Sequence, residues 1–183
     1  MESGKQFLVI GSINAAIFKE VFPLFVQGKI WFGNGFANGN AFFGIPPGGK
    51  SDYAEGVYDA ASGLVKFRNC GWFTNLDLGR RHQPLKLMTW AENLKYSRHK
   101  DVRTTGYQRY DDFDGIDVPH TDAIPEDYAG IMGVPVTFLD KHNPEQFEIL
   151  GLDRYYAGNP HYGRRFTIGG RETYARILIR RKG

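Results

Sequence analysis

The sequence has a single cysteine, no long apolar run and no leader peptide in its opening residues. Cys70 is the one thiol among 183 residues, which excludes an internal disulfide framework and favours a reducing compartment. No apolar run approaches the roughly 18 residues that cross a membrane, and residues 1–5 lack the pattern of a signal peptide. These absences predict a cytoplasmic protein with no membrane partner.

The apolar content is nevertheless sufficient for a folded core. Hydrophobic residues make up 42% of the chain and aromatic residues 15%, which argues against wholesale disorder. At this length we expect one domain, or a domain with a small appendage. The 23 glycines predict many turns and a fold rich in loops.

The charged residues are segregated along the chain. Eight acids and no Lys or Arg lie between residues 111 and 140, so the remainder holds 23 basic against 12 acidic residues, a net charge of +11. Such segregation is typical of a polyanion-binding face beside an acidic segment, although solvated surface charge explains it equally well. The basic residues gather at residues 80–82, 95–103, 164–165 and 180–182.

The first 32 residues have the pattern of a strand, a helix and a second strand. Residues 7–11 form a continuous apolar run, which predicts a strand buried on both faces of a parallel sheet. Ser12 can cap a helix that continues to about Phe25 with Pro23 limiting its end, and residues 29–32 predict the next strand. This is the unit of a doubly wound α/β fold, but the Gly-rich strand-turn that opens such a fold is missing.

Beyond Gly33 the pattern predicts loops and strands. Residues 33–56 indicate an extended loop, and residues 56–76 a hairpin that turns at residues 61–63 before one long strand. Residues 91–133 have weak periodicity and many turn formers. Further strands are expected at residues 85–90, 134–139 and 146–152, and a last hairpin, over residues 165–180, turns at Gly169 and Gly170.

No complete nucleotide-binding or methyl-transfer motif is present. Gly33-Asn34-Gly35 follows a predicted strand, but no helix start comes after it to face a cofactor, so we interpret it as a plain loop. Enzymes that methylate amines use Asn/Asp-Pro-Pro-Phe/Tyr, whose oxygens accept the amine hydrogens while the aromatic ring stacks on the base. Residues 45–48 supply only the prolines, and residues 143–144 only the Asn-Pro.

The sequence also offers no metal site or reactive nucleophile. The five histidines are dispersed, and none has ligand spacing with a cysteine or a carboxylate. Residues 111–115 approach a calcium-binding loop, but Tyr110 and Thr121 stand where acids are needed. Cys70 lies within a predicted strand, which favours a buried thiol. We therefore expect no metal and no cysteine chemistry.

One stretch, residues 69–82, combines aromatic and basic side chains. Trp72 and Phe73 are adjacent on a predicted strand, so they point to opposite faces and cannot share one core. One of them can stand at a cleft rim and stack on a nucleobase; the alternative is that both pack between sheet and helices.

Several segments, in order along nearly the whole chain, resemble the adenine-specific DNA methyltransferases of the EcoRI type. The longest and most specific are residues 127–141, 143–151 and 174–182. The other similar segments are residues 7–11 with Asn14, residues 19–24 and residues 70–77.

The resemblance implies a Rossmann-like domain that binds S-adenosylmethionine, flips an adenine out of the duplex and methylates its N6. In such enzymes the Asn-Pro-Pro-Phe motif and the Gly-rich strand-turn precede a strand that resembles residues 7–11. The chain is therefore expected to be the C-terminal part of the enzyme, inactive alone, with an N-terminal half supplied in trans or missing from the gene model.

The expected fold class is therefore α/β: the C-terminal part of a Rossmann-like S-adenosylmethionine-dependent methyltransferase sheet, with strand- and loop-rich DNA-recognition insertions. Residues 1–90 would complete the methyltransferase domain, and residues 91–183 would form a DNA-recognition region with C-terminal strands. Trp72 or Phe73 would stack on the adenine of double-stranded DNA. The phosphates would be contacted by Arg80, Arg81, Arg98, Lys100, Arg164 and Arg165. The alternatives are a non-catalytic DNA-binding or regulatory module, and a remnant that exposes a hydrophobic sheet edge.

Overall fold

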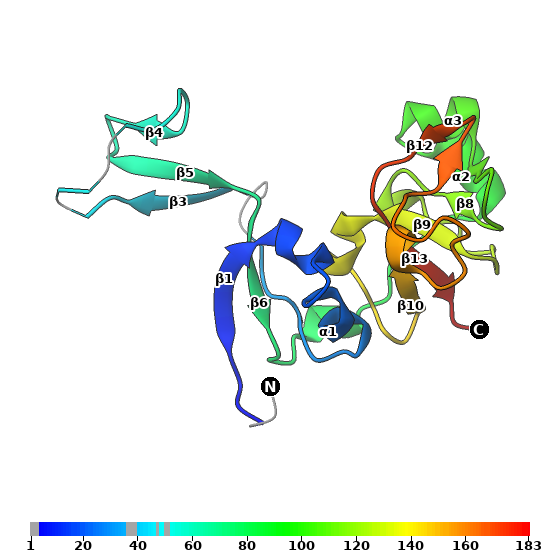
Figure 1. Cartoon of the computed structure of the whole chain (residues 1–183), viewed down its shortest axis with the longest axis horizontal. Coiled ribbons are helices and arrows are strands. Elements are labelled where there is room, and N and C mark those ends of the chain that lie inside the picture. Colours follow the sequence, from blue (N-terminus) through cyan, green and yellow to red (C-terminus); the bar gives the residue numbers. More distant parts are fainter. Residues whose placement is uncertain (1–3, 36–39, 47, 50–51) are drawn as a thin grey trace. The chain divides into compact units, whose positions relative to one another are not determined.

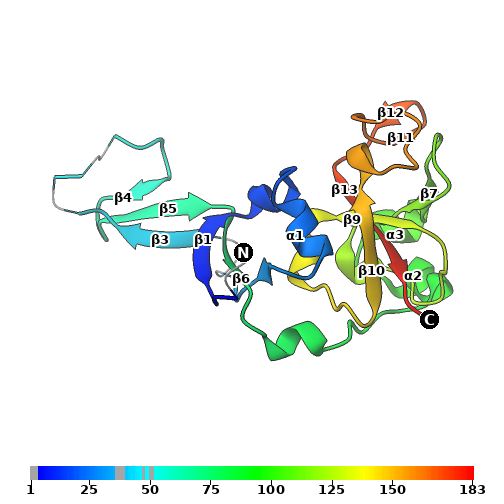
Figure 2. The same cartoon turned by 60° about the horizontal axis from the view of Figure 1, so that its bottom comes forward.

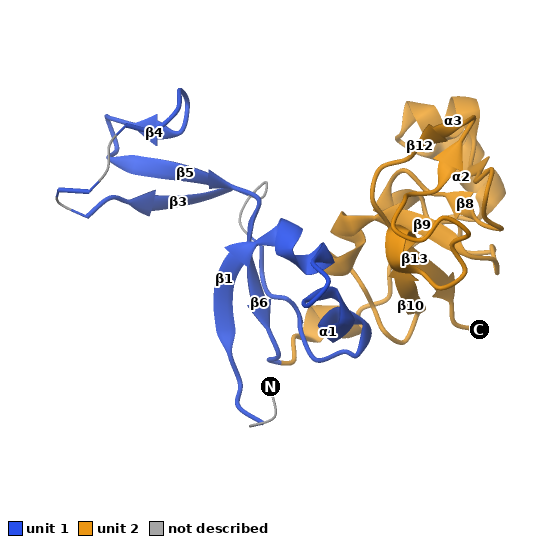
Figure 3. Ribbon diagram, viewed as in Figure 1, with its two compact units in different colours: residues 1–76 blue, residues 77–183 orange. Residues whose placement is uncertain are grey.

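A computed structural model describes residues 4–35, 40–46, 48–49 and 52–183. The chain divides into two compact units, residues 1–76 and residues 77–183 (Figure 3). This boundary precedes residue 90, where the sequence suggested a change of role. Short strands and short helices alternate in both units, so the expectation of a mixed α/β protein is confirmed. Among the described helices, none has the length and apolar character needed to cross a membrane.

Unit 1, residues 1–76, builds two small sheets and two short helical segments from its described residues (Figure 1). Its elements are β1 (Leu8–Ser12), the 3-10 helix η1 (Ile13–Ile17), α1 (Phe22–Val26), β2 (Trp31–Phe32), β3 (Asn40–Gly44), β4 (Tyr58–Asp59), β5 (Leu64–Arg68) and β6 (Cys70–Thr74).

The first sheet has the order β1-β6-β2. Both β1 and β2 are antiparallel to β6, so they run in the same direction and are joined through η1 and α1. The expected strand-helix-strand unit is thus present, with an antiparallel strand between its two strands. The expected burial of the first strand was wrong, because Leu8, Val9 and Ile10 remain 53%, 50% and 43% exposed. Only one edge of β1 is paired with a described strand, which leaves these side chains open to solvent.

The predicted single helix over residues 12–25 is two separate pieces. Ser12 caps the first piece as expected, since its hydroxyl accepts a hydrogen bond of 3.3 Å from the Asn14 N–H. The chain then becomes extended at Phe18, where φ is −72° and ψ is 146°. Pro23 lies in the first turn of α1 and does not end it. Proline fits there because the first N–H groups of a helix have no partner within the helix.

The second sheet, of order β3-β5-β4, confirms the predicted hairpin and corrects its surroundings. β4 pairs with β5 across a turn that contains Gly63 at φ +68°. The segment expected to be a loop contains β3, which pairs with β5 over its whole length. The predicted long strand is broken at Asn69, whose φ of 56° is incompatible with extended backbone, and this residue separates β5 from β6.

Unit 2, residues 77–183, is built around a five-stranded sheet of order β10-β13-β9-β8-β7 (Figure 2). Its elements are η3 (Gly79–His82), α2 (Trp90–Tyr96), α3 (Lys100–Thr105), β7 (Gln108–Arg109), β8 (Ile116–Asp117), η4 (Thr121–Ala123), β9 (Met132–Pro135), η5 (Val136–Asp140), β10 (Phe147–Leu152), η6 (Asp153–Tyr155), β11 (Thr167–Ile168), β12 (Arg171–Glu172) and β13 (Arg176–Arg181).

The core of unit 2 lies along β13, which pairs with β10 on one side and β9 on the other. Ile177, Leu178 and Ile179 are fully buried in this central strand. A continuous apolar run of this kind is expected for a strand covered on both faces. Phe138 and Phe147 pack beside each other at a centroid distance of 5.7 Å and complete the core. Only the β8–β9 pair is parallel among the described ladders of this sheet.

The outcome of the remaining predictions in unit 2 is mixed. The strand at residues 146–152 is confirmed as β10, and the turn at Gly169 and Gly170 joins β11 to β12, although β13 leaves that hairpin to enter the sheet. The strand expected at residues 85–90 was wrong: Met88 forms one isolated bridge with Pro125, and α2 begins at Trp90. The strand expected at residues 134–139 stops at Pro135, where η5 begins.

Candidate functional site

Trp72 and Phe73 occupy opposite faces of β6. Phe73 is 7% exposed and packs in the core of unit 1, with ring centroids 5.0 Å from Phe32 and 6.1 Å from Phe25. Trp72 is half-buried on the other face, where it is paired with Ile10 of β1. Side chains that alternate along a strand are separated in this way by the pleat. The two aromatics therefore have different surroundings, and Trp72 is the one with access to solvent.

Gly33 serves the packing of this sheet. Its N–H donates a hydrogen bond of 2.7 Å to the Trp72 carbonyl, and a Cβ atom at this position would lie 2.9 Å from the Trp72 Cβ. A side chain is therefore excluded by the close approach of the two backbones. Residues 33–35 lie outside the described helices and strands, and the segment in which a helix start would face a cofactor, residues 36–39, lies outside the described residues.

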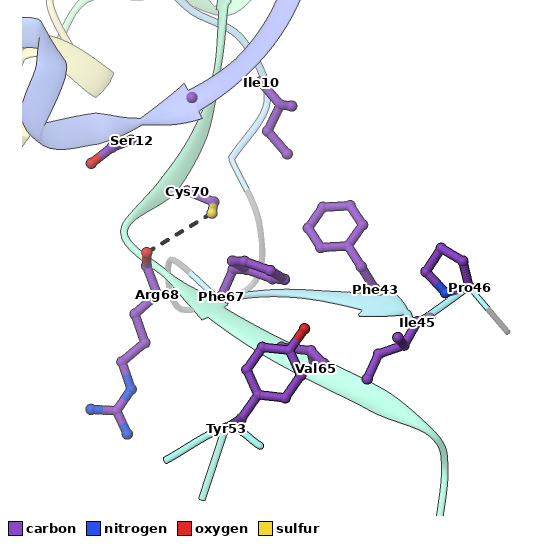
Figure 4. A pocket seen from close by; sticks show the side chains of 12 residues that line it. Ile10, Ser12, Phe43, Ile45, Pro46, Tyr53, Val65, Phe67, Arg68 and Cys70 are labelled. Carbon is purple, nitrogen blue, oxygen red and sulfur yellow. Dashed lines mark hydrogen bonds between the residues drawn. The ribbon is translucent and has the colours of Figure 1, made fainter. Parts of the chain in front are cut away.

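A hollow of about 570 Å³ lies within unit 1, between the side chains of its two sheets (Figure 4). Phe43, Val65 and Phe67 line it from β3 and β5, while Ile10 and Cys70 line it from β1 and β6. Cys70 is half-exposed, so the expected buried thiol is not found, and its Sγ lies 3.9 Å from the Arg68 carbonyl oxygen. Of the proline pair in residues 45–48, Pro46 lines the hollow and Pro47 lies outside the described residues.

The lining of this hollow does not fit S-adenosylmethionine. Nucleoside cofactors in α/β folds are held by an acidic residue at the ribose hydroxyls and by a helix N-terminus or Gly-rich turn. The described lining residues include no carboxylate, and Arg68 adds a positive charge near a space that would have to accept a cationic sulfonium. The described lining of this hollow is therefore mainly apolar and does not fit this cofactor.

The basic residues expected to contact phosphate are largely engaged within unit 2. Arg80 binds Asp140 at 2.9 Å, Arg98 binds Asp122 at 2.8 Å, and Arg164 lies 3.7 Å from Glu172. The first two of these pairs use acids of residues 111–140. Acidic and basic residues that are separated along the sequence are thus neighbours in the folded unit, because acids of residues 111–140 form ion pairs with the basic clusters. Lys100 is exposed in α3, and Arg165 is half-buried with its Nη1 donating to the Thr173 carbonyl at 3.3 Å.

Two basic clusters that are far apart in sequence converge near His142. Burial lowers the pKa of His142, and the positive charges of Arg81 and Lys182 lower it further. Burial also lowers the pKa of Arg81, with Asp77 opposing the shift. Arg81 of residues 80–82 and Lys182 of residues 180–182 are thus the members of the two clusters whose charge acts on His142. Two cations that act on one imidazole favour the approach of an anion such as phosphate.

The remaining acids and amides singled out in the sequence have structural partners. Asp111 accepts hydrogen bonds from the Gly169 and Gly170 N–H groups, at 3.1 and 2.8 Å, and Asp112 accepts one from Thr167. These residues therefore hold the β11–β12 hairpin. The Asn143 side chain is buried and accepts hydrogen bonds from the backbone of the turn that follows it. The Asn-Pro pair thus shapes a turn.

A group of titratable side chains that the sequence interpretation missed lies between α3 and η4. His99, Asp101 and His120 each place one ligand atom within 4.8 Å of the other two. The expectation that the histidines are dispersed was therefore wrong for His99 and His120, whose rings stack. The triplet His-x-Asp occurs twice, at residues 99–101 and 120–122, and this repeat was a signal available in the sequence.

Comparison with known proteins gives one family over the whole chain. The sequence model of the family described as adenine-specific methyltransferase EcoRI matches residues 1–182. The chain is 37% identical over 183 residues to the Type II methyltransferase M.EcoRI of Escherichia coli, covering 97% of this chain and 51% of that protein. It is 31% identical over 195 residues to the Type II methyltransferase M.MpnI of Mycoplasma pneumoniae, covering 99% of this chain and 58% of that protein. The chain thus spans little more than half the length of these relatives, and no solved structure matches it significantly.

Proposed function

Because the chain belongs to the adenine-specific methyltransferases of the EcoRI type, we propose that it acts as part of a DNA adenine-N6 methyltransferase of a restriction-modification system. The observation that supports this proposal most directly is that the sequence model of the family matches residues 1–182. Double-stranded DNA is the proposed partner and the cytoplasm the proposed location. The chain spans about half the length of M.EcoRI, so the proposed activity also needs the part of the enzyme that these 183 residues do not include.

The first sheet supports a place within a larger Rossmann-like sheet. Mixed sheets of doubly wound proteins carry an antiparallel strand near the edge of otherwise parallel strands, and β6 has this relation to β1 and β2. We propose that the rest of the enzyme pairs with the other edge of β1, which no described strand occupies. Leu8, Val9 and Ile10 are about half-exposed, and a completed sheet with its covering helices would bury them.

S-adenosylmethionine is the methyl donor that the family implies, and it would be bound mainly outside this chain. The described lining of the hollow in unit 1 does not fit this cofactor, and the sequence lacks the complete Asn-Pro-Pro-Phe motif. The donor supplies an electrophilic methyl group to the adenine N6. Within unit 1, Trp72 would hold the flipped base by stacking, because it is the solvent-accessible aromatic of β6. Phe73 would support the strand from the core.

Unit 2 would contact the DNA backbone through its cations. The convergence of Arg81 and Lys182 near His142 supports a phosphate contact at this place. The other proposed contacts are Arg80, Arg98, Lys100, Arg164 and Arg165. Those that are ion-paired in the chain would have to exchange an acid for a phosphate, so we expect them to contribute less to affinity.

A chimera tests the proposed function directly. The part of M.EcoRI that aligns with this chain is replaced by the 183 residues, and cofactor binding and adenine methylation of duplex DNA are measured. We expect the chimera to bind S-adenosylmethionine and methylate adenine, and the chain alone to do neither. The proposal is contradicted if a folded chimera binds the cofactor and DNA but transfers no methyl group, or if the isolated chain methylates DNA unaided.

The second candidate is a non-catalytic DNA-binding or regulatory module. The lack of a fitting cofactor lining among the described residues favours it. Cofactor titration separates the two functions, because a pure binding module leaves S-adenosylmethionine unbound even when the other half of the enzyme is present. DNA binding by the isolated chain that is unaffected by that half would support this second function.

A further inference from the structure

The two His-x-Asp triplets of unit 2 are cross-connected. The Nε2 atom of His99 lies 2.8 Å from Asp122 Oδ1, and the Nε2 atom of His120 lies 2.8 Å from Asp101 Oδ2. Each histidine thus binds the aspartate of the other triplet. The two imidazoles stack at a centroid distance of 3.6 Å with an interplanar angle of 6°. This arrangement holds the two rings side by side in parallel planes, so they have to turn for both Nε2 lone pairs to reach one ion.

The group has the composition of a transition-metal site. Two imidazole nitrogens and a carboxylate oxygen are a ligand set that zinc uses in proteins, with a fourth position left for water. One such atom each from His99, Asp101 and His120 lies within 4.8 Å of the other two. Ligand atoms of a tetrahedral zinc ion lie about 3.3 Å apart, so the group has to contract by about 1.5 Å at most. The Asp101 side chain is 53% exposed and His120 34%, which leaves room for that rotation.

Asp122 has a different role in the group. Its second oxygen, Oδ2, is bound by the Arg98 guanidinium at 2.8 Å. A cation already paired with this carboxylate competes with a metal ion for it. Asp122 is therefore the partner of His99 in the metal-free chain, and because it contacts Nε2, this hydrogen bond is given up when Nε2 binds the ion.

We propose that His99, Asp101 and His120 bind one divalent transition-metal ion of the zinc class. His99 immediately precedes α3 and His120 immediately precedes η4, so the ion would join two segments that are far apart in the sequence. Binding requires Nε2 to be unprotonated: the remaining proton of a neutral ring moves to Nδ1, and an imidazolium releases one proton to solvent. The role is structural and does not depend on methyl transfer.

The test is a titration of the metal-free full chain with Zn²⁺, followed by calorimetry and by the thermal midpoint of unfolding. We expect one zinc ion per chain and a rise of the midpoint on binding, because a ligand that binds only the folded state stabilises it. Mg²⁺ and Ca²⁺ at the same concentration should leave the midpoint unchanged, since both prefer oxygen ligands and two of the three ligands here are nitrogens.

Two substitutions and a matched control locate the site. His120→Gln and Asp101→Asn, which keep the size and polarity of the side chains, should each weaken zinc binding by about tenfold or more. His161→Gln removes an exposed histidine outside the group and should leave the affinity unchanged. Circular dichroism confirms that each variant is folded. The proposal is overturned if the folded chain binds no zinc saturably, or if zinc binding survives His120→Gln and Asp101→Asn unaltered, which would leave a hydrogen-bonded surface cluster.

Discussion

Trp72 and Phe73 are adjacent in the chain, yet their substitution should have different consequences. Phe73 packs against Phe25 and Phe32, so Phe73→Ala should lower the free energy of unfolding by about 3–5 kcal/mol. Trp72→Ala should cost less stability but raise the barrier to methylation in the chimera by about 1–3 kcal/mol, the worth of a base-stacking aromatic. Chemical denaturation and methylation rates of both variants measure the difference. Full activity of a Trp72→Ala chimera would contradict the stacking role.

His142 makes stability depend on pH at the residue scale. Its pKa is lowered from 6.5 by burial and by the charges of Arg81 and Lys182. The unfolded chain therefore takes up a proton at a higher pH than the folded chain. The resulting stabilisation is fully present above pH 6.5 and is lost as the pH falls through the folded pKa. Denaturation curves between pH 7.5 and about 5 should show this loss, and His142→Gln should reduce it.

The same imidazole reports on DNA contact. Phosphates placed near Arg81 and Lys182 offset their charge, so duplex DNA should raise the pKa of His142 in a titration followed by NMR. Arg81→Gln should raise it without DNA, and Arg109→Gln, at an arginine paired with Asp114, serves as the control. A pKa of His142 that does not move on saturation with DNA would place the phosphates elsewhere.

At the scale of elements, the start of α2 is stabilised by a capping box whose two residues, Thr89 and Glu92, have the expected spacing in the sequence. Thr89 accepts a hydrogen bond from the Glu92 N–H at 3.3 Å, and the Glu92 carboxylate accepts one from the Thr89 N–H at 2.9 Å. Thr89→Ala removes this capping box and should lower the free energy of unfolding by about 1 kcal/mol. Thr105→Ala, at an exposed site in α3, should change it little. Equal effects of the two substitutions would show that the cap contributes nothing.

Local patterns predicted the hairpin turns, whose cause is local, but missed α2 despite its local capping box and missed the elements set by distant partners. The β4–β5 hairpin and the Gly169–Gly170 turn follow from glycines that adopt positive φ, which a sequence reveals. β3 lies in a segment rich in Gly, Asn and Pro and becomes a strand only because β5 pairs with it. The break at Asn69 is likewise hidden, since a non-glycine residue with positive φ has no unique local signature.

The features of the candidate site likewise divide into those with a local cause, which could be predicted, and those that depend on distant residues. The opposite orientation of Trp72 and Phe73 was predictable, because the pleat of a strand alternates its side chains. The pairing of Arg80 with Asp140, and of His99 with Asp122, joins residues far apart in the chain. The periodicity of apolar residues along the sequence contains no information on such pairs. Counting the charges outside residues 111–140 therefore overestimated the number of cations that could contact phosphate.

For the whole molecule, these internal ion pairs would determine how the proposed DNA binding responds to salt. Affinity should fall between about 50 and 200 mM salt, but less steeply than if every assigned cation were available to phosphate. Asp140→Asn removes the acid that binds Arg80 at 2.9 Å and should steepen the dependence. Arg81→Glu should weaken binding similarly on all sequences, with Arg109→Glu as the control. Fluorescence anisotropy with duplexes of different sequence measures both effects, and affinity that is flat across this salt range would contradict a DNA-facing role.

The open edge of β1 also affects how the chain behaves when it is isolated. An edge strand with exposed Leu8, Val9 and Ile10 offers backbone hydrogen bonds and apolar contact to any other extended chain, a second copy included. The 183 residues produced by themselves should therefore tend to self-associate through this edge. Val9→Lys should keep them soluble, and the same substitution in the chimera should weaken the pairing of β1 with the rest of the enzyme.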